Sequence, residues 1–133
     1  MMSNHNVDVQ RVLVIGIDPE AVAHLGIDAE VVRAALARGQ ERFASAGIPA
    51  DLCLVGLEAG SASEQIVAQL AARSYACVVI GGGIRKPEPM LEFFERVINL
   101  VGRHAPDAAI AFNTSAEDSV DAARRWLPAS GER

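Results

Sequence analysis

Four short apolar runs recur along the chain, and they limit its possible folds more than any other feature does. Their sequences are RVLVIGI at 11–17, DLCLVGL at 51–57, ACVVIGG at 76–82 and AAIAF at 108–112. None alternates strictly between apolar and polar residues, so each predicts a strand that is buried on both faces. Such strands are typical of a parallel sheet between helices, which places the chain in the α/β class.

Helical patterns separate these runs. Asp28 is a suitable N-cap for the first helix, and two later helices open on the spacing of a capping box, Ser61 with Glu64 and Ser115 with Asp118. The predicted helices cover 29–46, a segment that starts at Ser61, 89–104 and 115–127.

The order β-α-β-α-β-α-β-α predicts a three-layer α/β/α domain, because right-handed crossovers place helices on both faces of a parallel sheet. We expect four strands in the order 2-1-3-4, a flavodoxin-like or receiver-like (Rossmann-like) layout. The 133 residues suit one domain. It would cover 11–128, between a disordered segment at 1–10 and a tail at 129–133.

Composition argues against several classes of protein. The formal net charge of -5 disfavours general nucleic-acid binding. No apolar run approaches the roughly 20 residues of a membrane span, and the polar first residues lack the apolar core of a signal peptide. Cys53 and Cys77 fall in predicted strands, as reduced core thiols do, with no further metal ligands close by. We expect a cytoplasmic protein with no membrane or nucleic-acid partner, metal or cofactor.

The ends of the predicted strands are the place to look for a site. In an open α/β sheet, ligands bind outside the carboxyl ends of the strands, where the strand order reverses. Here that point lies between the first and third strands. The candidate ligand-binding residues follow the strands there: Asp18, Gly81, Gly82, Gly83, Arg85, Lys86, Asn113 and Thr114.

The stretch GGGIRK at 81–86 suits an anion. Glycines allow the backbone to turn with positive φ, and the free N–H groups of such a turn form an anion nest. Arg85 would add a planar fork for phosphate or carboxylate, and Lys86 a mobile positive charge. The alternative is a tight strand-to-helix turn followed by two solvated cations.

Two residues near the first strand are candidates for acid–base chemistry. Asp18 would pair with Arg85, bind a cation or accept hydrogen bonds from a ligand, although Asp-Pro is also ordinary turn chemistry. His24 lies in the connection 18–28, which exceeds the roughly two to six residues usual for such loops and is a candidate lid. The alternative for His24 is a surface histidine.

Several established motifs do not occur in the sequence. The residues VIGIDPE after the first apolar run contain no G-x-G-x-x-G fingerprint, and neither a P-loop nor a G-x-S-x-G elbow is found. The layout resembles the response-regulator receiver family, whose positions Asp18 and Thr114 match loosely. Gly81 and Gly82 stand where a receiver carries its phosphate-accepting aspartate, and the fifth strand with its lysine is missing. Phosphorelay is therefore not expected.

A second resemblance covers most of the chain. The segments GGGIRKPEPMLEFFERVINLV and AFNTSAEDSVDAARRWL resemble small uncharacterised bacterial proteins of this architecture. This resemblance implies a flavodoxin-like fold and no established activity.

The third predicted helix has an unusually wide apolar arc. A wide arc often marks a subunit contact, so we expect a homodimer through the helix around Met90–Val101. Two neighbouring stripes make up the arc, Leu91, Phe94, Ile98 and Val101 with Met90, Phe93, Val97 and Leu100.

These observations lead to one expected function and two alternatives. We expect binding of an anionic, phosphate- or carboxylate-bearing small molecule at the carboxyl ends of the strands. The first alternative is a receiver-like regulatory or scaffolding module that acts through the third helix, without ligand. The second is an enzyme for a sugar phosphate or nucleotide, which would need a general base with a shifted pKa in the pocket. Asp18 and His24 are the candidate acid or base if the expected anion site is catalytic, and whether the chain is an enzyme stays open at this point.

Overall fold

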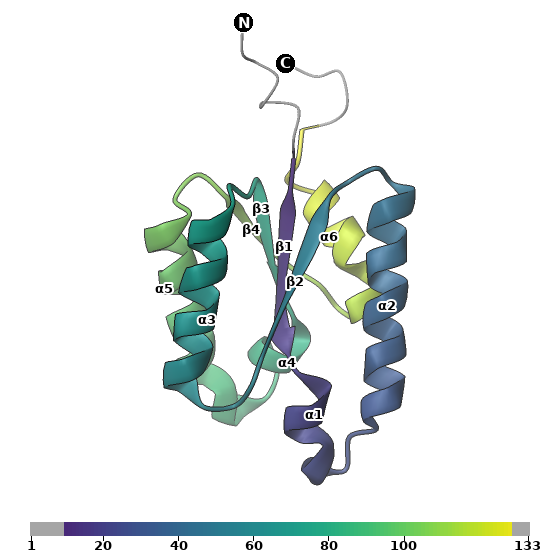
Figure 1. Cartoon of the computed structure of the whole chain (residues 1–133), viewed down its shortest axis with the longest axis vertical. Coiled ribbons are helices and arrows are strands. Elements are labelled where there is room, and N and C mark those ends of the chain that lie inside the picture. The colour runs from purple at the N-terminus through teal and green to yellow at the C-terminus, as the bar shows by residue number, and fades with distance from the viewer. Residues whose placement is uncertain (1–9, 129–133) are drawn as a thin grey trace, which may run out of the picture.

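The structure, a computed structural model, describes residues 10–128 and contains a four-stranded, all-parallel sheet with helices on both faces (Figure 1). The fold is flavodoxin-like, which confirms the predicted class and strand order. Apart from Gln10, the predicted N-terminal segment and C-terminal tail lie outside the described residues. The strands run in the order β2-β1-β3-β4, with bounds β1 (Val12–Ile17), β2 (Ala50–Val55), β3 (Cys77–Ile80) and β4 (Ala109–Phe112).

The main helices cover both faces of the sheet (Figure 1). They are α2 (Ala29–Ser45) and α6 (Ser119–Arg124) on one face, and α3 (Ala59–Ala72) and α5 (Leu91–His104) on the other. None of the helices within 10–128 is long and apolar enough to cross a lipid bilayer. Short helical turns complete the chain: α1 (Pro19–Val22), η2 (Ala23–Leu25), α4 (Gly82–Arg85), η3 (Glu88–Met90) and η4 (Ala116–Asp118).

The central strands are apolar throughout because both of their faces are buried. In β1, Leu13 and Ile15 belong to the core between the sheet and the α3–α5 layer, whereas Val12 and Val14 belong to the core on the α2–α6 side. All four are at most 4% exposed. The alternation of side chains along a strand thus feeds two separate cores, as the continuous apolar runs predicted.

The connection 18–28 is not the irregular loop that its length predicted. Asp18 accepts a hydrogen bond from the backbone N–H of Glu20 at 3.0 Å and caps α1, which begins at Pro19. The turn η2 follows, and Gly26 ends it with a φ of 85°. Proline at the first helical position and the aspartate cap stabilise this compact turn. The candidate lid therefore consists of two short helical turns, and its role as a lid stays a prediction.

Helix α3 begins earlier than predicted. Its N-cap is Glu58, whose carboxylate accepts hydrogen bonds from the backbone N–H groups of Gly60 at 3.0 Å and Ser61 at 2.8 Å. The hydrogen bond from Ser61 and, to a smaller extent, that from Gly60 lower the pKa of the Glu58 carboxyl. Because Glu58 already satisfies the first donors, Ser61 lies inside the helix and the predicted Ser61–Glu64 capping box is wrong.

The other predicted caps are present. Asp28 caps α2 by accepting from the backbone N–H groups of Glu30 and Val31. Ser115 and Asp118 form the predicted capping box, but it opens the 3-10 turn η4, and α6 ends at Arg124 rather than at Leu127.

Most of the apolar arc of α5 is used inside the domain. Val97 and Val101 are fully buried, and four neighbours that are partly buried pack against the same core. Leu91 differs, because 55% of its surface is exposed. The four packed neighbours are Phe93, Phe94, Ile98 and Leu100.

Candidate functional site

The candidate site lies at the carboxyl ends of β1, β3 and β4, where the predicted residues come together in part. Strands β1 and β3 are parallel neighbours, with Ile15 opposite Ile80, so the segments that leave them lie at the same end of the sheet. At this end α4 follows β3 directly (Figure 1). Arg85 and Lys86 at the end of α4 both reach the residues that follow β4.

The glycines of the stretch 81–86 do not form the predicted turn with positive φ. Gly81 is extended, with φ -74° and ψ 158°, and Gly82 and Gly83 belong to the helical turn α4. Among the described residues, only Gly26 and Gly47 have positive φ. The anion nest built on positive φ is therefore not formed.

A close approach of neighbouring groups explains these glycines instead. A Cβ at Gly81 would lie 3.2 Å from the carbonyl oxygen of Ile15, which itself accepts a hydrogen bond from the Gly81 N–H at 2.9 Å. A Cβ at Gly82 would lie 3.1 Å from Cε of Lys86. The absence of side chains thus lets the end of β3 stay against β1 and leaves room for the Lys86 chain.

Arg85 is fixed on β4 by two contacts. Its Nη2 donates a hydrogen bond to the backbone carbonyl of Asn113, and its guanidinium carbon lies 5.3 Å from the centroid of the Phe112 ring. Phe112 in turn makes an edge-to-face contact with Phe94 of α5, with the ring centroids 5.8 Å apart. The cation therefore lies on an aromatic surface that α5 supports.

Lys86 extends the same arrangement by one residue. Its Nζ donates to the backbone carbonyl of Thr114 at 3.1 Å. Within 10–128, neither Lys86 nor Arg85 has a carboxylate within 4.0 Å. Among the described residues, these two adjacent positive charges therefore have only neutral partners, two backbone carbonyls and the Phe112 ring.

Asn113 and Thr114 use their side-chain donors within the domain. Asn113 is 4% exposed, and its Nδ2 donates to Oγ of Ser119 at 2.9 Å. The Thr114 hydroxyl donates to the carboxylate of Asp118, which also accepts from the Thr114 N–H at 2.9 Å. Burial alone would raise the pKa of Asp118, but the hydrogen bonds from Thr114 and Ser115 outweigh it and lower that pKa.

Two buried polar atoms at this end of the sheet lack a hydrogen-bond partner among the described residues. They are Nε of Arg85, a donor, and Oδ1 of Asn113, an acceptor. Buried polar groups without partners are uncommon in folded proteins, so both mark the junction of α4 and β4 as unusual.

Neither candidate acid–base residue forms an ion pair with Arg85 or Lys86 among the described residues. Asp18 is engaged in capping α1, and no ion pair joins it to Arg85 within the described part of the chain. His24 lies in η2 and is exposed, and its imidazole has no hydrogen bond with another described residue. No group of three or more histidine, cysteine, aspartate or glutamate side chains suited to a metal occurs in 10–128.

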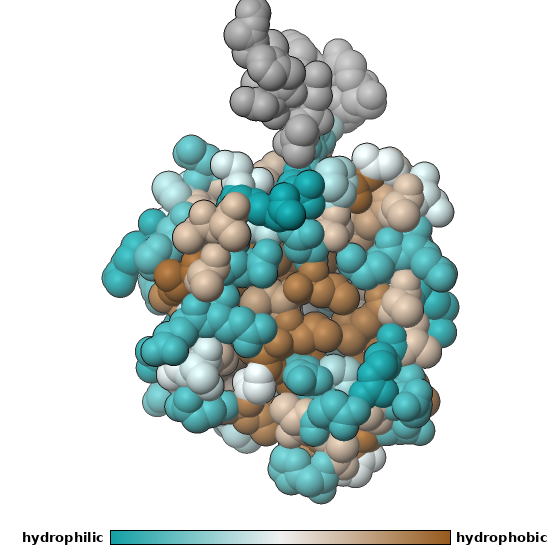
Figure 2. Space-filling view, viewed as in Figure 1, coloured by the Kyte–Doolittle hydropathy of each residue, from teal (hydrophilic) through white to brown (hydrophobic). Residues whose placement is uncertain are grey.

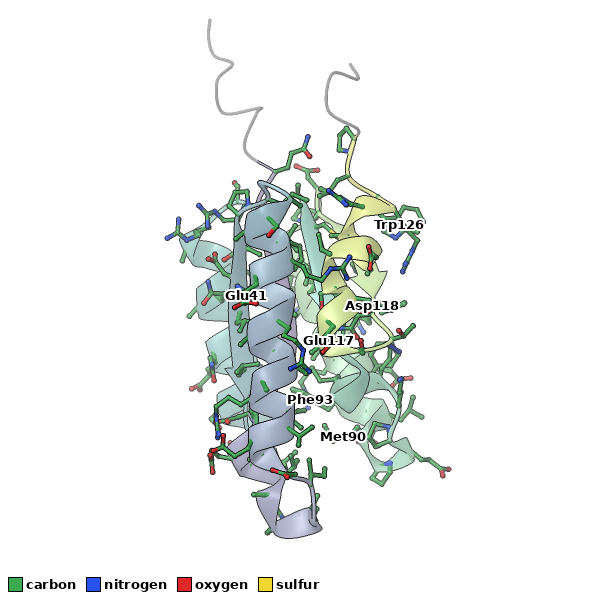
Figure 3. All side chains as sticks on the ribbon, turned by 90° about the vertical axis from the view of Figure 1, so that its right-hand side faces the viewer. Glu41, Met90, Phe93, Glu117, Asp118 and Trp126 are labelled. Carbon is green, nitrogen blue, oxygen red and sulfur yellow. The ribbon has the colours of Figure 1, made fainter. Side chains whose placement is uncertain are left out.

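An open groove between α2, η4 and α6 was not predicted. Its volume is about 670 Å³, and Figure 3 shows α2 and α6 side by side, with Glu41 and Glu117 labelled on their elements. Arg42 donates to both carboxylate oxygens of Asp121, at 2.8 and 3.1 Å, and this pairing raises the pKa of Arg42 and lowers that of Asp121. Arg38 pairs with Glu117. The ion pairs join residues 79 positions apart, and no local pattern indicates them.

No protein-family model matches the chain, and no curated protein is similar enough to match it.

Proposed function

We propose that the protein binds an anionic small molecule, one that bears a phosphate or a carboxylate, at the carboxyl ends of β3 and β4. The observation that supports this proposal most directly is the pair of cations at the end of α4. Arg85 and Lys86 converge on the residues after β4, and they donate hydrogen bonds to backbone carbonyls rather than to carboxylates.

The lack of an acidic partner for these two cations is unexpected in a chain with more acidic than basic residues. The chain contains 17 acidic and 12 basic residues, yet no acidic side chain compensates either cation among the described residues. A ligand anion would exchange a neutral acceptor for a charged one, and hydrogen bonds between ions are roughly twice as strong as neutral ones. Phe112 holds the guanidinium in place, which reduces the entropy that Arg85 loses on binding.

Lys86 is the single lysine of the sequence, which gives a direct test. Reductive methylation would modify the side chain of Lys86 alone, besides the N-terminal amine. Inorganic phosphate, pyrophosphate and citrate serve as probes, and mass spectrometry reports the rate of modification. We expect at least one probe to slow methylation of Lys86 in a saturable manner, because a bound anion covers the amine.

A second measurement assigns the binding to Arg85. Titrations followed by amide chemical shifts should show the largest changes at Gly82, Gly83 and Thr114. Arg85→Ala should weaken binding by about tenfold or more, which corresponds to loss of one charged hydrogen bond. Arg103→Ala is the matched control, since Arg103 is exposed at the end of α5, away from the site. The proposal is lost if all three probes bind Arg85→Ala as they bind the wild type.

The second candidate function is a receiver-like regulatory or scaffolding module that works as a homodimer through α5. Leu91 supports it, as an apolar side chain 55% exposed at the start of that helix. Phe93 and Leu100 are poor test positions because they pack on the core. Leu91→Asp would abolish a dimer in sedimentation experiments without damage to the core, and leave anion binding unchanged.

We also propose that the protein works in the cytoplasm. Cys53 and Cys77 are both buried and free. Cysteines with free thiols are typical of proteins that work in a reducing compartment.

A further inference from the structure

Strand β2 forms one edge of the sheet, and half of its backbone groups point away from β1. Val12 N–H donates to the carbonyl of Pro49 at 2.9 Å, and Asp18 N–H donates to that of Val55 at 2.8 Å. The backbone N–H and C=O groups of the odd-numbered residues between 49 and 55 therefore point toward β1. Since the direction of the backbone groups alternates along a strand, the N–H and C=O groups of Ala50, Leu52 and Leu54 point outward.

Two glutamines from opposite faces of the sheet occupy outward carbonyls of this edge. Gln40 of α2 donates from Nε2 to the carbonyl of Ala50 at 3.1 Å. Gln65 of α3 donates from Nε2 to the carbonyl of Leu54 at 2.9 Å. The two helices flank β2 from its two sides (Figure 1), so the glutamines reach the strand from either side at positions four residues apart.

The opposite edge of the sheet has a similar contact. Ala109 N–H donates to the carbonyl of Ala76 at 2.9 Å, so Ala109 faces β3 and the carbonyl of Phe112 points outward. Arg125, just after α6, donates to this carbonyl at 2.9 Å. Long side chains from the flanking helices thus occupy outward carbonyls on both edge strands.

An open edge beside apolar side chains is a template for the addition of another strand. The face in front of β2 is of this kind: apolar residues gather in its middle, between polar flanks (Figure 2). Leu52 and Leu54 are only half-buried there. The natural occupant is the same strand of a second copy, because an antiparallel pair centred on Leu52 would place Ala50 of each copy opposite Leu54 of the other.

We propose that Gln40 and Gln65 prevent this pairing by occupying the carbonyls of Ala50 and Leu54. In the two-fold arrangement each of these carbonyls would accept from an N–H of the other copy. With the glutamines in place, only the central Leu52 groups remain to exchange hydrogen bonds. An isolated pair of bonds does not hold two strands together, so this edge stays open without associating.

To test the proposal, the side-chain donors of Gln40 and Gln65 are removed, and pairing of β2 with β2 of a second copy is measured. The variant Q40A/Q65A keeps helix-forming residues in α2 and α3, so we expect its circular dichroism to match the wild type. Sedimentation at about 100 µM, a concentration at which exposed edges associate, should show a mass that rises with concentration toward twice the value found for the wild type. Hydrogen exchange should slow at the amides of Ala50, Leu52 and Leu54, by about tenfold or more as they become protected.

The control variant is E41A/E64A, which changes the residues adjacent to the two glutamines on the same helices. Both glutamates are exposed, and E41A/E64A removes two negative charges, a change that itself favours association. It should nevertheless sediment as the wild type does. The variant Q40K/Q65K keeps a donor at each position and should suppress the association seen with alanine. Q40A/Q65A that sediments as the wild type does, or that associates without slower exchange at these three amides, overturns the proposal.

Discussion

The guanidinium of Arg85 lies over the ring of Phe112, with its carbon 5.3 Å from the ring centroid. The same guanidinium donates to the carbonyl of Asn113, the next residue along the chain. This pair joins α4 to the edge strand β4, and it positions the charge on which the proposed anion site depends. It therefore has consequences for stability as well as for binding.

The coupling between Arg85 and Phe112 can be measured with a double-mutant cycle. We expect Arg85→Ala and Phe112→Leu to lose less together than the sum of their separate effects on the free energy of unfolding. The difference should be about 0.5–1 kcal/mol, as for cation–π pairs that are partly exposed. Urea unfolding provides the four values, and strictly additive losses would show that the ring and the guanidinium are independent.

Two glycines in helices should respond to alanine with opposite signs. In α2, a Cβ at Gly39 would lie 2.4 Å from the backbone carbonyl oxygen of Ala116, so Gly39→Ala must push η4 away from the helix. We expect a loss of about 1–3 kcal/mol of stability. In α5, a Cβ at Gly102 would meet nothing within 4 Å, so Gly102→Ala should gain up to about 1 kcal/mol from helix propensity. Thermal unfolding distinguishes the two, and equal effects at both positions would contradict the close contact at Gly39.

Alkaline pH should destabilise the fold through three buried groups. Burial raises the pKa of the Cys53 thiol and of the Cys77 thiol from 9.0 to about 11, and burial followed by the bond to Asp51 raises the pKa of Tyr75 from 10.0 to about 12. A raised pKa in the folded state means that the stability is complete below the unfolded value and is lost as the pH rises through the folded value. The thiols should therefore act between pH 9 and 11 and the phenol between pH 10 and 12.

Tyr75→Phe separates the phenol from the thiols. Tyr75 donates to Asp51 at 2.7 Å and accepts from Gln69 at 2.8 Å, so the variant should be less stable at neutral pH. It should also lose the phenol's share of the alkaline decline, which is worth about 3 kcal/mol in the wild type and extends to higher pH than the share of the thiols. Unfolding midpoints across this pH range provide the comparison, and an unchanged slope above pH 11 in Tyr75→Phe would exclude the phenol as its cause.

Acid should weaken the contacts of Asp118. Its pKa is lowered in the fold, so the stability it provides is present above the unfolded value of 3.8 and is lost as the pH falls through the folded value. Asp118→Asn should lower the unfolding midpoint at neutral pH, and the difference from the wild type should shrink in acid. Asp107→Asn, at an exposed position, is the control. A difference that stays constant with pH would show that the charge of Asp118 does not contribute.

The sequence by itself determined the sheet and much of its surroundings. A strand that is buried on both faces can be recognised from its own residues, because a strand such as β1 must be apolar at every position. Four such runs with helices between them allow few arrangements of the chain. The N-cap Asp28 was equally predictable, since a cap acts within three residues of itself. Glu58 was missed because its position before α3 competes with a nearby serine that has an equally good pattern.

Only the tertiary structure decided what the site residues contact. The roles of Gly81 and Gly82 depend on the carbonyl of Ile15 and on the Lys86 side chain, and not on the positive φ that a glycine run favours. Arg85 meets Asn113 across 28 residues of chain, and Arg42 meets Asp121 across 79. Such contacts follow from the packing of whole elements against the sheet. A pattern within a few neighbouring residues contains no information on them, because the partners become neighbours only after the chain has folded.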